Sequence, residues 1–320
     1  MPIKEQIQSA ILGMMAKVKF DPKAHLYINA ETGDWLQGVS TVSSIVPKDW
    51  LSAWGAKEAV KFLGYSDYEG DTERAEDILK LLKDIDLPHY QALLKDAKGA
   101  SARKSKTALV DGAKGHGWLE TMVLASIRGQ EAPKIPEGTL ERPLTQFVAW
   151  AEKEVDYWIA SEARVAYPEK GYAGTLDALA MMKTGKLAVI DFKFASHISE
   201  DYFLQTAGYQ ATFEPYEIKF DERIIVRLPK TLEREEYDKI THKYSMIPND
   251  LEVKVVDTEY KLDRDAFFAA LVVKRWINQV SGAKKVIYPK KKEDKAITTM
   301  TAKRDAEIVE SILREEAMGD

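Results

Sequence analysis

The chain has 320 residues, of which 45% are hydrophobic and 30% are charged. This length can bury a sizeable core, and we expect one large domain or a domain with an appendage. The absence of cysteine excludes disulfides, thiolate zinc sites and cysteine-held iron–sulfur clusters. The net charge of -5 is unusual for a protein that coats DNA passively, although an acidic protein can still carry a local basic groove.

The N-terminal segment and the hydropathy of the chain indicate a protein without a membrane partner. No apolar run reaches the ~20 residues that a membrane-spanning helix needs. Residues 1–20 space their apolar side chains at the helical period and lack the apolar stretch and cleavage site of a secretory signal. We therefore expect an amphipathic N-terminal helix and a cytoplasmic location.

The rest of the N-terminal third is expected to be a hairpin followed by helices. Residues 25–39 have strand-forming side chains around a turn-rich centre, which predicts a β-hairpin. Ser40 or Thr41 can cap a helix that runs toward Trp54, with an interruption at Pro47. The following residues, as far as 110, are charged and mostly helical in pattern.

The middle of the chain predicts a sheet flanked by helices. Residues 111–128 read as a loop entering a helix, and residues 141–160 read as a second helix. Further elements are expected as strands over 163–167, 172–182, 187–194, 223–228 and 251–256, and as helices over 201–213 and 263–280. The core order of helix, three strands, helix and strand indicates an α/β or α+β fold with a central mixed sheet.

These expected elements divide the chain into three parts. Residues 1–110 form an N-terminal hairpin and mostly helical extension. Residues 111–283 form the core, and residues 284–320 form a basic linker and a C-terminal helix.

Two acidic residues in apolar strands are the strongest indication of a metal-binding or catalytic site. Asp177 lies in the middle of one predicted strand, and Asp191 lies at the end of the next. The turn between the strands makes them an antiparallel hairpin, which can place the two carboxylates side by side. Their mutual repulsion would raise one pKa, and a divalent cation would remove the repulsion because hard cations prefer carboxylate oxygens.

Lys193 lies two positions after Asp191, so both side chains point to the same face of the strand. Its ammonium group can orient or help to deprotonate an attacking water, or can offset charge at a phosphate. Phe192 points to the other face, but its backbone carbonyl is a candidate metal ligand.

Taken in order, these motifs resemble those of RecB-like PD-(D/E)XK nucleases. The chain shows Gly-x-x-Asp at 174–177, Asp-x-Lys at 191–193 and Gln-x-x-x-Tyr at 205–209, with a histidine ahead of the sheet at His116. The motifs cover roughly residues 115–210, and the stretches 38–42 and 51–54 are similar to phage-encoded members. The resemblance implies a restriction-endonuclease-like core over residues 111–283.

The resemblance also implies a role for each motif residue. Asp177 and Asp191 would bind Mg²⁺ or Mn²⁺, His116 would be a further ligand through a neutral imidazole nitrogen, and Lys193 would act on the water. The leaving group would be the 3′ oxygen, which gives 5′-phosphate products.

The remaining candidates would support that centre. Gln205 and Tyr209 lie one helical turn apart and would steady the site or the DNA backbone. Glu120 lies one turn from His116 and would hold its other ring nitrogen. Glu162 is a weaker candidate for the metal site.

Basic and aromatic residues outside the motifs have two interpretations each. The DNA-binding candidates are Arg103, Lys104, Lys106, Lys290, Lys291 and Lys292, which can equally be a solvated surface or tail. Trp35, Trp50 and Trp54 are interpreted as core residues, with stacking on single strands as the alternative.

The departures from the family narrow the expected function. Without cysteines the chain is unlike the iron–sulfur branch, and without a Walker A motif it is unlike the helicase–nuclease fusions. It resembles stand-alone exonucleases, including phage recombination exonucleases, which would act in the host cytoplasm. The implied substrate is linear DNA ends, single-stranded ends included, in recombination, replication or repair, beside a recombination or single-strand-binding protein.

Two alternatives remain open. An endonuclease or nickase would carry the same motifs. A non-catalytic DNA-binding module of the same fold would show a broken set of metal ligands, which this sequence does not show. By analogy alone, residues 40–110 can form an arch or lid that admits a DNA end.

Overall fold

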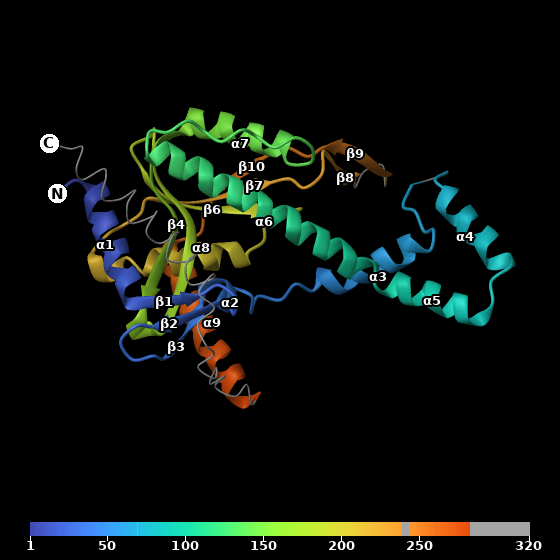
Figure 1. The fold of residues 1–320 in the computed structure, drawn as a ribbon, viewed down its shortest axis with the longest axis horizontal. Coiled ribbons are helices and arrows are strands. Elements are labelled where there is room, and N and C mark those ends of the chain that lie inside the picture. Colours follow the sequence, from blue (N-terminus) through green and yellow to red (C-terminus); the bar gives the residue numbers. More distant parts are fainter. Residues whose placement is uncertain (69, 239–242, 282–320) are drawn as a thin grey trace.

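The computed structural model describes residues 1–68, 70–238 and 243–281 (Figure 1). The expected C-terminal helix and the candidate DNA-binding residues Lys290, Lys291 and Lys292 lie outside the described residues.

Helices and strands alternate along the described chain. The helices are α1 (Ile3–Lys17), α2 (Val39–Ser43), α3 (Trp50–Phe62), α4 (Glu73–Lys83), α5 (Leu87–Lys98), α6 (Ala100–Ile127), α7 (Glu141–Glu154), α8 (Asp201–Ala211) and α9 (Tyr260–Val280). The strands are β1 (Val18–Asp21), β2 (Leu26–Asn29), β3 (Trp35–Gly38), β4 (Val155–Tyr167), β5 (Tyr172–Met182), β6 (Leu187–Phe194), β7 (Glu222–Leu228), β8 (Glu233–Asp238), β9 (Lys243–Pro248) and β10 (Glu252–Val255).

One mixed sheet organises the fold. β4 and β5 form a long antiparallel hairpin, while β3 and β6 share the other edge of β5. β3 runs parallel to the start of β5 at Tyr172 and Ala173, and β6 runs antiparallel to its end from Ala178 to Met181. Within the described chain, residues 174–177 have no strand partner on that edge, so a fork opens between β3 and β6.

Helices cover both faces of this sheet. One buried cluster packs α1, α2, α8 and α9 against the strands, and it includes Leu187 and Val189 of β6. A second cluster packs α6 and α7 and includes Ala188 and Ile190. Because successive strand residues point to opposite faces, the two clusters lie on opposite sides of the sheet. The expected central mixed sheet flanked by helices is therefore confirmed.

Several predicted boundaries are wrong. The helix expected to reach residue 160 ends at Glu154, and β4 begins at Val155, eight residues before the expected strand. The apolar residues at this position fit one face of a helix, but they form a strand with buried residues on both faces. The hairpin β8–β9 was not expected, because its sequence is rich in charge and poor in alternating apolar residues.

The predicted loop at the start of residues 111–128 is also wrong, because α6 is one continuous helix across this region. Its glycines at 112, 115 and 117 suggested a loop. The expected boundary between residues 110 and 111 consequently falls inside a helix.

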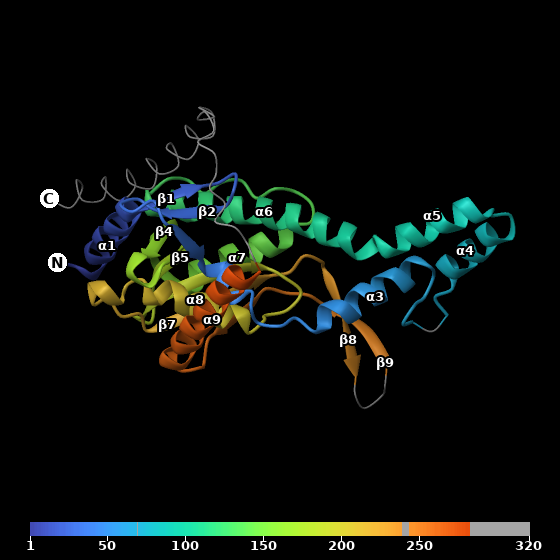
Figure 2. The ribbon, with the colours of Figure 1, turned by 90° about the horizontal axis from the view of Figure 1, so that it is seen from below.

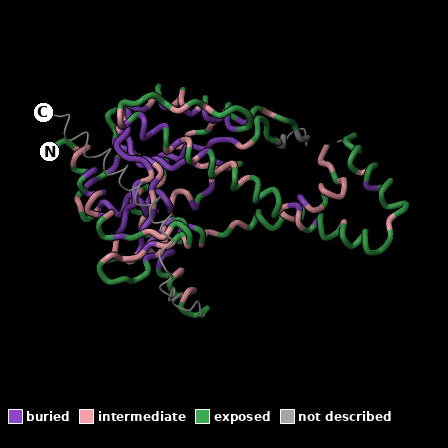
Figure 3. Tube along the Cα trace, in the orientation of Figure 1, coloured by how far each residue is buried: buried purple, intermediate pink, exposed green. Residues whose placement is uncertain are grey.

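The helices α3, α4 and α5, with the first turns of α6, extend from the core as a helical arm, residues 50–110 (Figures 1 and 2). Most of the arm is exposed, in contrast to the buried strands of the sheet (Figure 3). The arm projects away from the sheet in both views. The chain enters it through the linker 44–49.

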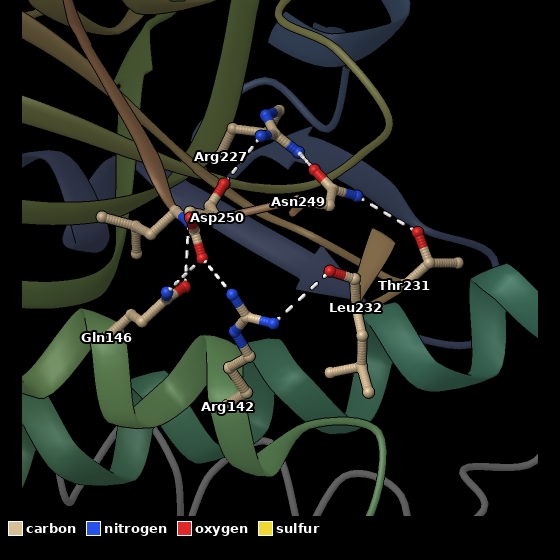
Figure 4. A network of polar contacts seen from close by, with 8 residues as sticks. Arg142, Gln146, Arg227, Thr231, Leu232, Asn249 and Asp250 are labelled. Atoms are coloured by element: carbon tan, nitrogen blue, oxygen red, sulfur yellow. Dashed lines mark hydrogen bonds and ion pairs between the residues drawn. The ribbon is translucent and has the colours of Figure 1, made fainter. Parts of the chain in front are cut away.

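A polar network fastens the far edge of the sheet to α7 (Figure 4). The buried Arg227 donates hydrogen bonds to the Asn249 side chain at 3.1 Å and to the Asp250 carbonyl at 2.8 Å. The Asp250 carboxylate in turn accepts from Arg142 and from Gln146. These bonds join α7 to the segment between β9 and β10 and hold the base of the β8–β9 hairpin.

Candidate active site

The centre of the site lies where β5 and β6 separate. Their last paired residues are Ala178 and Ile190, and the same register continued by one position sets Asp177 opposite Asp191. Beyond this point the N–H of Phe192 donates to Asp177 Oδ2 at 2.7 Å instead of to a strand partner. The N–H and C=O of one strand residue point the same way, so the Phe192 carbonyl also faces the fork. That orientation suits the predicted role of this carbonyl as a ligand.

Asp191 and Lys193 form a buried ion pair on the α8 side of the sheet. Lys193 Nζ lies 2.6 Å from Asp191 Oδ2, and Asp191 has no exposed surface. Asp191 Oδ1 is buried without a hydrogen-bond partner. A buried carboxylate oxygen without a partner is costly, and a bound cation is one way to satisfy it.

Burial raises the pKa of Asp191, and the neighbouring Asp177 carboxylate raises it further, while Lys193 opposes both effects. For Lys193, burial lowers the pKa, but the attraction of Asp191 and Asp177 outweighs burial and raises it overall. Lys193 is therefore protonated at neutral pH and acts as a donor of hydrogen bonds and positive charge.

Three further potential ligands gather beside this pair. His116, Glu162 and Asp177 each offer one ligand atom, and these three atoms lie within 4.8 Å of one another. The residues come from α6, β4 and β5, so three separate elements converge on the fork. Carboxylate oxygens and an imidazole nitrogen are a donor set that divalent cations such as Mn²⁺ and Mg²⁺ accept.

Glu162 reaches the cluster through a distorted strand. Its φ is +49°, although it lies in the middle of β4 between the paired residues Ser161 and Ala163. A left-handed conformation costs about 1–2 kcal/mol for a residue with a side chain, and such strain often marks a functional position. In the sequence Glu162 was only a weaker candidate, because no residue pattern shows that a strand is distorted.

His116 is placed by the contact between α6 and the end of β6. Its ring meets the Phe194 ring edge-to-face, with the centroids 5.5 Å apart. A Cβ at Gly115 would lie 2.1 Å from Phe194 Cζ, so only glycine lets the helix approach this closely. Burial lowers the pKa of His116, with Asp177 opposing the shift, so the imidazole is neutral and able to act as a ligand.

α8 supplies a hydrogen-bonded pair of residues that lies next to the carboxylates of the site. Gln205 Nε2 donates to the Tyr209 hydroxyl at 3.1 Å, and both side chains are buried. Burial raises the pKa of Tyr209 well above its usual value, and the charges of Asp177 and Asp191 add to the shift. Gly174 leaves room for Tyr209, because a Cβ there would lie 2.7 Å from the ring.

The other candidates among the described residues all lie on α6. Glu120 lies on α6 one turn beyond His116, and the three-residue cluster does not include it. Lys104 is ion-paired with Glu58, and Arg103 bonds to the Asp96 carbonyl, so both stabilise the helical arm. Lys106 is an exposed residue of the same helix. In the structure, Arg103 and Lys104 therefore hold helices of the arm together.

One residue at the centre was missed by the sequence analysis. Tyr202 lies in the first turn of α8, and Lys193 Nζ lies 5.1 Å from the centroid of its ring. Tyr202 falls three residues before Gln205, outside the Gln-x-x-x-Tyr pattern, so no motif marks it.

In the described part of the chain, no helix has both the length and the apolar character to cross a membrane. Neither a family model nor a curated protein sequence matches this chain.

Proposed function

We propose that this protein is a PD-(D/E)XK-type deoxyribonuclease that requires a divalent cation and hydrolyses phosphodiester bonds at DNA ends, in recombination, replication or repair. One observation carries the proposal. The protonated Lys193 is paired with a buried Asp191 whose Oδ1 has no hydrogen-bond partner, next to the clustered donors of His116, Glu162 and Asp177. The order of these residues in the sequence and the resemblance to the family support the same conclusion.

The residues at the fork suit a divalent cation. Asp177, Glu162 and His116 would hold it, with Asp191 Oδ1 and the Phe192 carbonyl as further ligands. When bound, Mg²⁺ or Mn²⁺ would polarise the scissile phosphate and lower the pKa of a water molecule.

The chain's own groups account for the remaining steps. Lys193 Nζ donates a hydrogen bond to the attacking water or to a phosphate oxygen, and its charge offsets the negative charge that develops at phosphorus. The attacking water gives up a proton to the surrounding solvent and its oxygen forms the new bond to phosphorus. The bond from phosphorus to the 3′ oxygen breaks, this oxygen takes up a proton from solvent, and the product carries a 5′-phosphate. Gln205 and Tyr209 keep the α8 side of the site in place.

The test compares DNA with and without ends. The protein is incubated with end-labelled linear DNA and with closed circular DNA, each with Mg²⁺, with Mn²⁺ or with EDTA. Loss of linear DNA alone, dependent on the cation, is the expected result, and nicking of circles would indicate an endonuclease instead. Cleavage that persists in EDTA, or in Asp191→Ala, would overturn the proposal.

A further inference from the structure

The linker 44–49 lies against the start of α8, beside the proposed active site. Lys48 Nζ is 3.0 Å from Asp201 Oδ2 and 5.8 Å from the centroid of the Tyr202 ring. Lys193 Nζ lies 5.1 Å from the same ring. Tyr202 therefore connects the linker to the Asp191–Lys193 pair, and the residues that follow Lys48 begin next to the reaction centre.

Trp50 is the first residue of α3 and follows directly on this linker. It is 45% exposed, which contradicts its interpretation as a core residue. Its ring meets the His197 ring edge-to-face, with the centroids 5.0 Å apart and the planes at 78°. His197 is itself exposed, and its Nδ1 is hydrogen-bonded to Ser196 Oγ at 3.0 Å. The two rings support each other while both remain open to solvent.

We propose that Trp50, held by His197, stacks against an unpaired nucleobase of the DNA strand whose phosphate is attacked. This inference rests on the proposed function and names the form of DNA that the site takes. His197 lies four positions after Lys193, so their Cα atoms are at most about 14 Å apart. At the duplex rise of ~3.4 Å per nucleotide, a distance of this size corresponds to about four nucleotides, so the stacked base lies a few nucleotides from the attacked phosphate.

The chemistry of the surface favours stacking over phosphate binding. The charge of Lys48 is matched by the buried Asp201, and the neighbouring Asp49 and Glu200 are exposed acids. An aromatic face binds any base, but inside a duplex both faces of a base are covered by its neighbours. Away from the terminal pair, only a single-stranded or frayed end offers a free base, so the enzyme prefers such ends to fully paired ones.

The experiment distinguishes binding to the stacked base from binding to the rest of the DNA strand. The values of kcat and KM are measured on a single-stranded oligonucleotide, and on the same oligonucleotide with abasic residues at its four terminal positions. The variants are Trp50→Ala, Trp50→Phe and the control Trp276→Ala, which removes an exposed indole from α9. Thermal unfolding of each variant shows whether it is folded.

Trp50→Ala is expected to raise KM about 10-fold on the intact strand with little change in kcat, since stacking of one base supports a change of this size. Trp50→Phe restores most of the loss, and Trp276→Ala has no effect. On the abasic strand, the wild-type protein shows the raised KM, and Trp50→Ala raises it no further. An unchanged KM for Trp50→Ala, or an equal loss on both strands, overturns the stacking role, including the case in which Trp50 serves a partner protein.

The two proposals fail in different ways. If the wild-type protein cleaves DNA and Trp50→Ala behaves like it, the stacking role fails and the nuclease activity stands. If the wild-type protein cleaves nothing, the proposed activity fails. The binding of the two oligonucleotides, followed by fluorescence anisotropy in EDTA, then decides the stacking role, because stacking needs no cation.

Discussion

Lys193 Nζ lies 2.6 Å from Asp191 Oδ2, and the two residues stand two positions apart on one strand. This spacing places both side chains on the same face of the strand. Because the pair is buried, the charged form of each residue is stabilised by the charge of the other. Lys193 thus lowers the cost of a negative charge on Asp191 without removing it, since burial still raises the pKa of Asp191.

Replacing Lys193 should therefore affect catalysis and the titration of Asp191 together. We expect Lys193→Ala to lower kcat by about 100-fold or more, the usual scale for a group that acts on the water or on developing charge. It should also raise the pKa of Asp191 further, because the opposing positive charge is gone. Single-turnover cleavage with saturating Mg²⁺ measures the first effect.

The control is Lys186→Ala, because Lys186 also lies 2.6 Å from a carboxylate, that of Glu222, but at an exposed end of the same sheet. It should leave kcat unchanged, since surface ion pairs contribute little. Equal losses in the two variants would argue against a special role for Lys193.

The binding of the cation should depend on pH because of Asp191. Burial raises the pKa of Asp191 from 3.8 to about 7. Between these values the folded protein keeps a proton that the unfolded chain has lost, so the contribution of this group to the free energy of unfolding falls as the pH rises through this window. A cation must displace that proton, so its apparent affinity should rise about 10-fold per pH unit up to the folded pKa and then level off.

Calorimetric titration with Mg²⁺ at pH 6, 7 and 8, in buffers of different ionisation enthalpy, measures both the affinity and the proton released. Asp191→Asn is the matched control, which should bind weakly and without release of this proton. An affinity that does not change over this range would show that Asp191 is already ionised without the cation.

The sequence predicted the centre of the site more fully than its surroundings. Asp177, Asp191 and Lys193 were identified because strand alternation and a short turn are local properties, and β5 and β6 begin and end where expected. The start of β4 was missed because a short, mostly apolar stretch fits a helix and a buried strand equally well. Its distortion at Glu162 and the approach of Tyr202 depend on contacts between distant segments, which no local pattern contains.

Gly115 should be the least replaceable of the three glycines of α6. In Gly115→Ala the new Cβ would lie 2.1 Å from Phe194 Cζ, so either the ring or the helix carrying His116 must move. We expect a loss of about 1–3 kcal/mol in the free energy of unfolding, the usual cost of overpacking, together with weaker cation binding. Urea unfolding with and without Mg²⁺ measures both.

Gly117 provides the comparison on the same helix. A Cβ there would meet nothing within 4 Å, so Gly117→Ala should stabilise the protein by up to about 1 kcal/mol through helix propensity. The double change Gly115→Ala with Phe194→Leu should recover part of the lost stability. If Gly115→Ala were as stable as Gly117→Ala, the close packing of α6 on β6 would be wrong.

Two substitutions of Glu162 distinguish the effect of its backbone strain from the effect of its carboxylate on cation binding. Both Glu162→Ala and Glu162→Gly remove the carboxylate, so both should weaken Mg²⁺ binding, seen as a smaller rise in Tm on adding the cation. They differ at the backbone, because φ of +49° is strained for alanine and ordinary for glycine. In EDTA, Glu162→Gly should therefore be more stable than Glu162→Ala by about 1 kcal/mol, the reverse of the usual order within a strand. If alanine were the more stable of the two, the distortion of β4 would not be a feature of the folded protein. If Mg²⁺ raised the Tm of both variants as much as it raises that of the wild-type protein, Glu162 would not be a ligand.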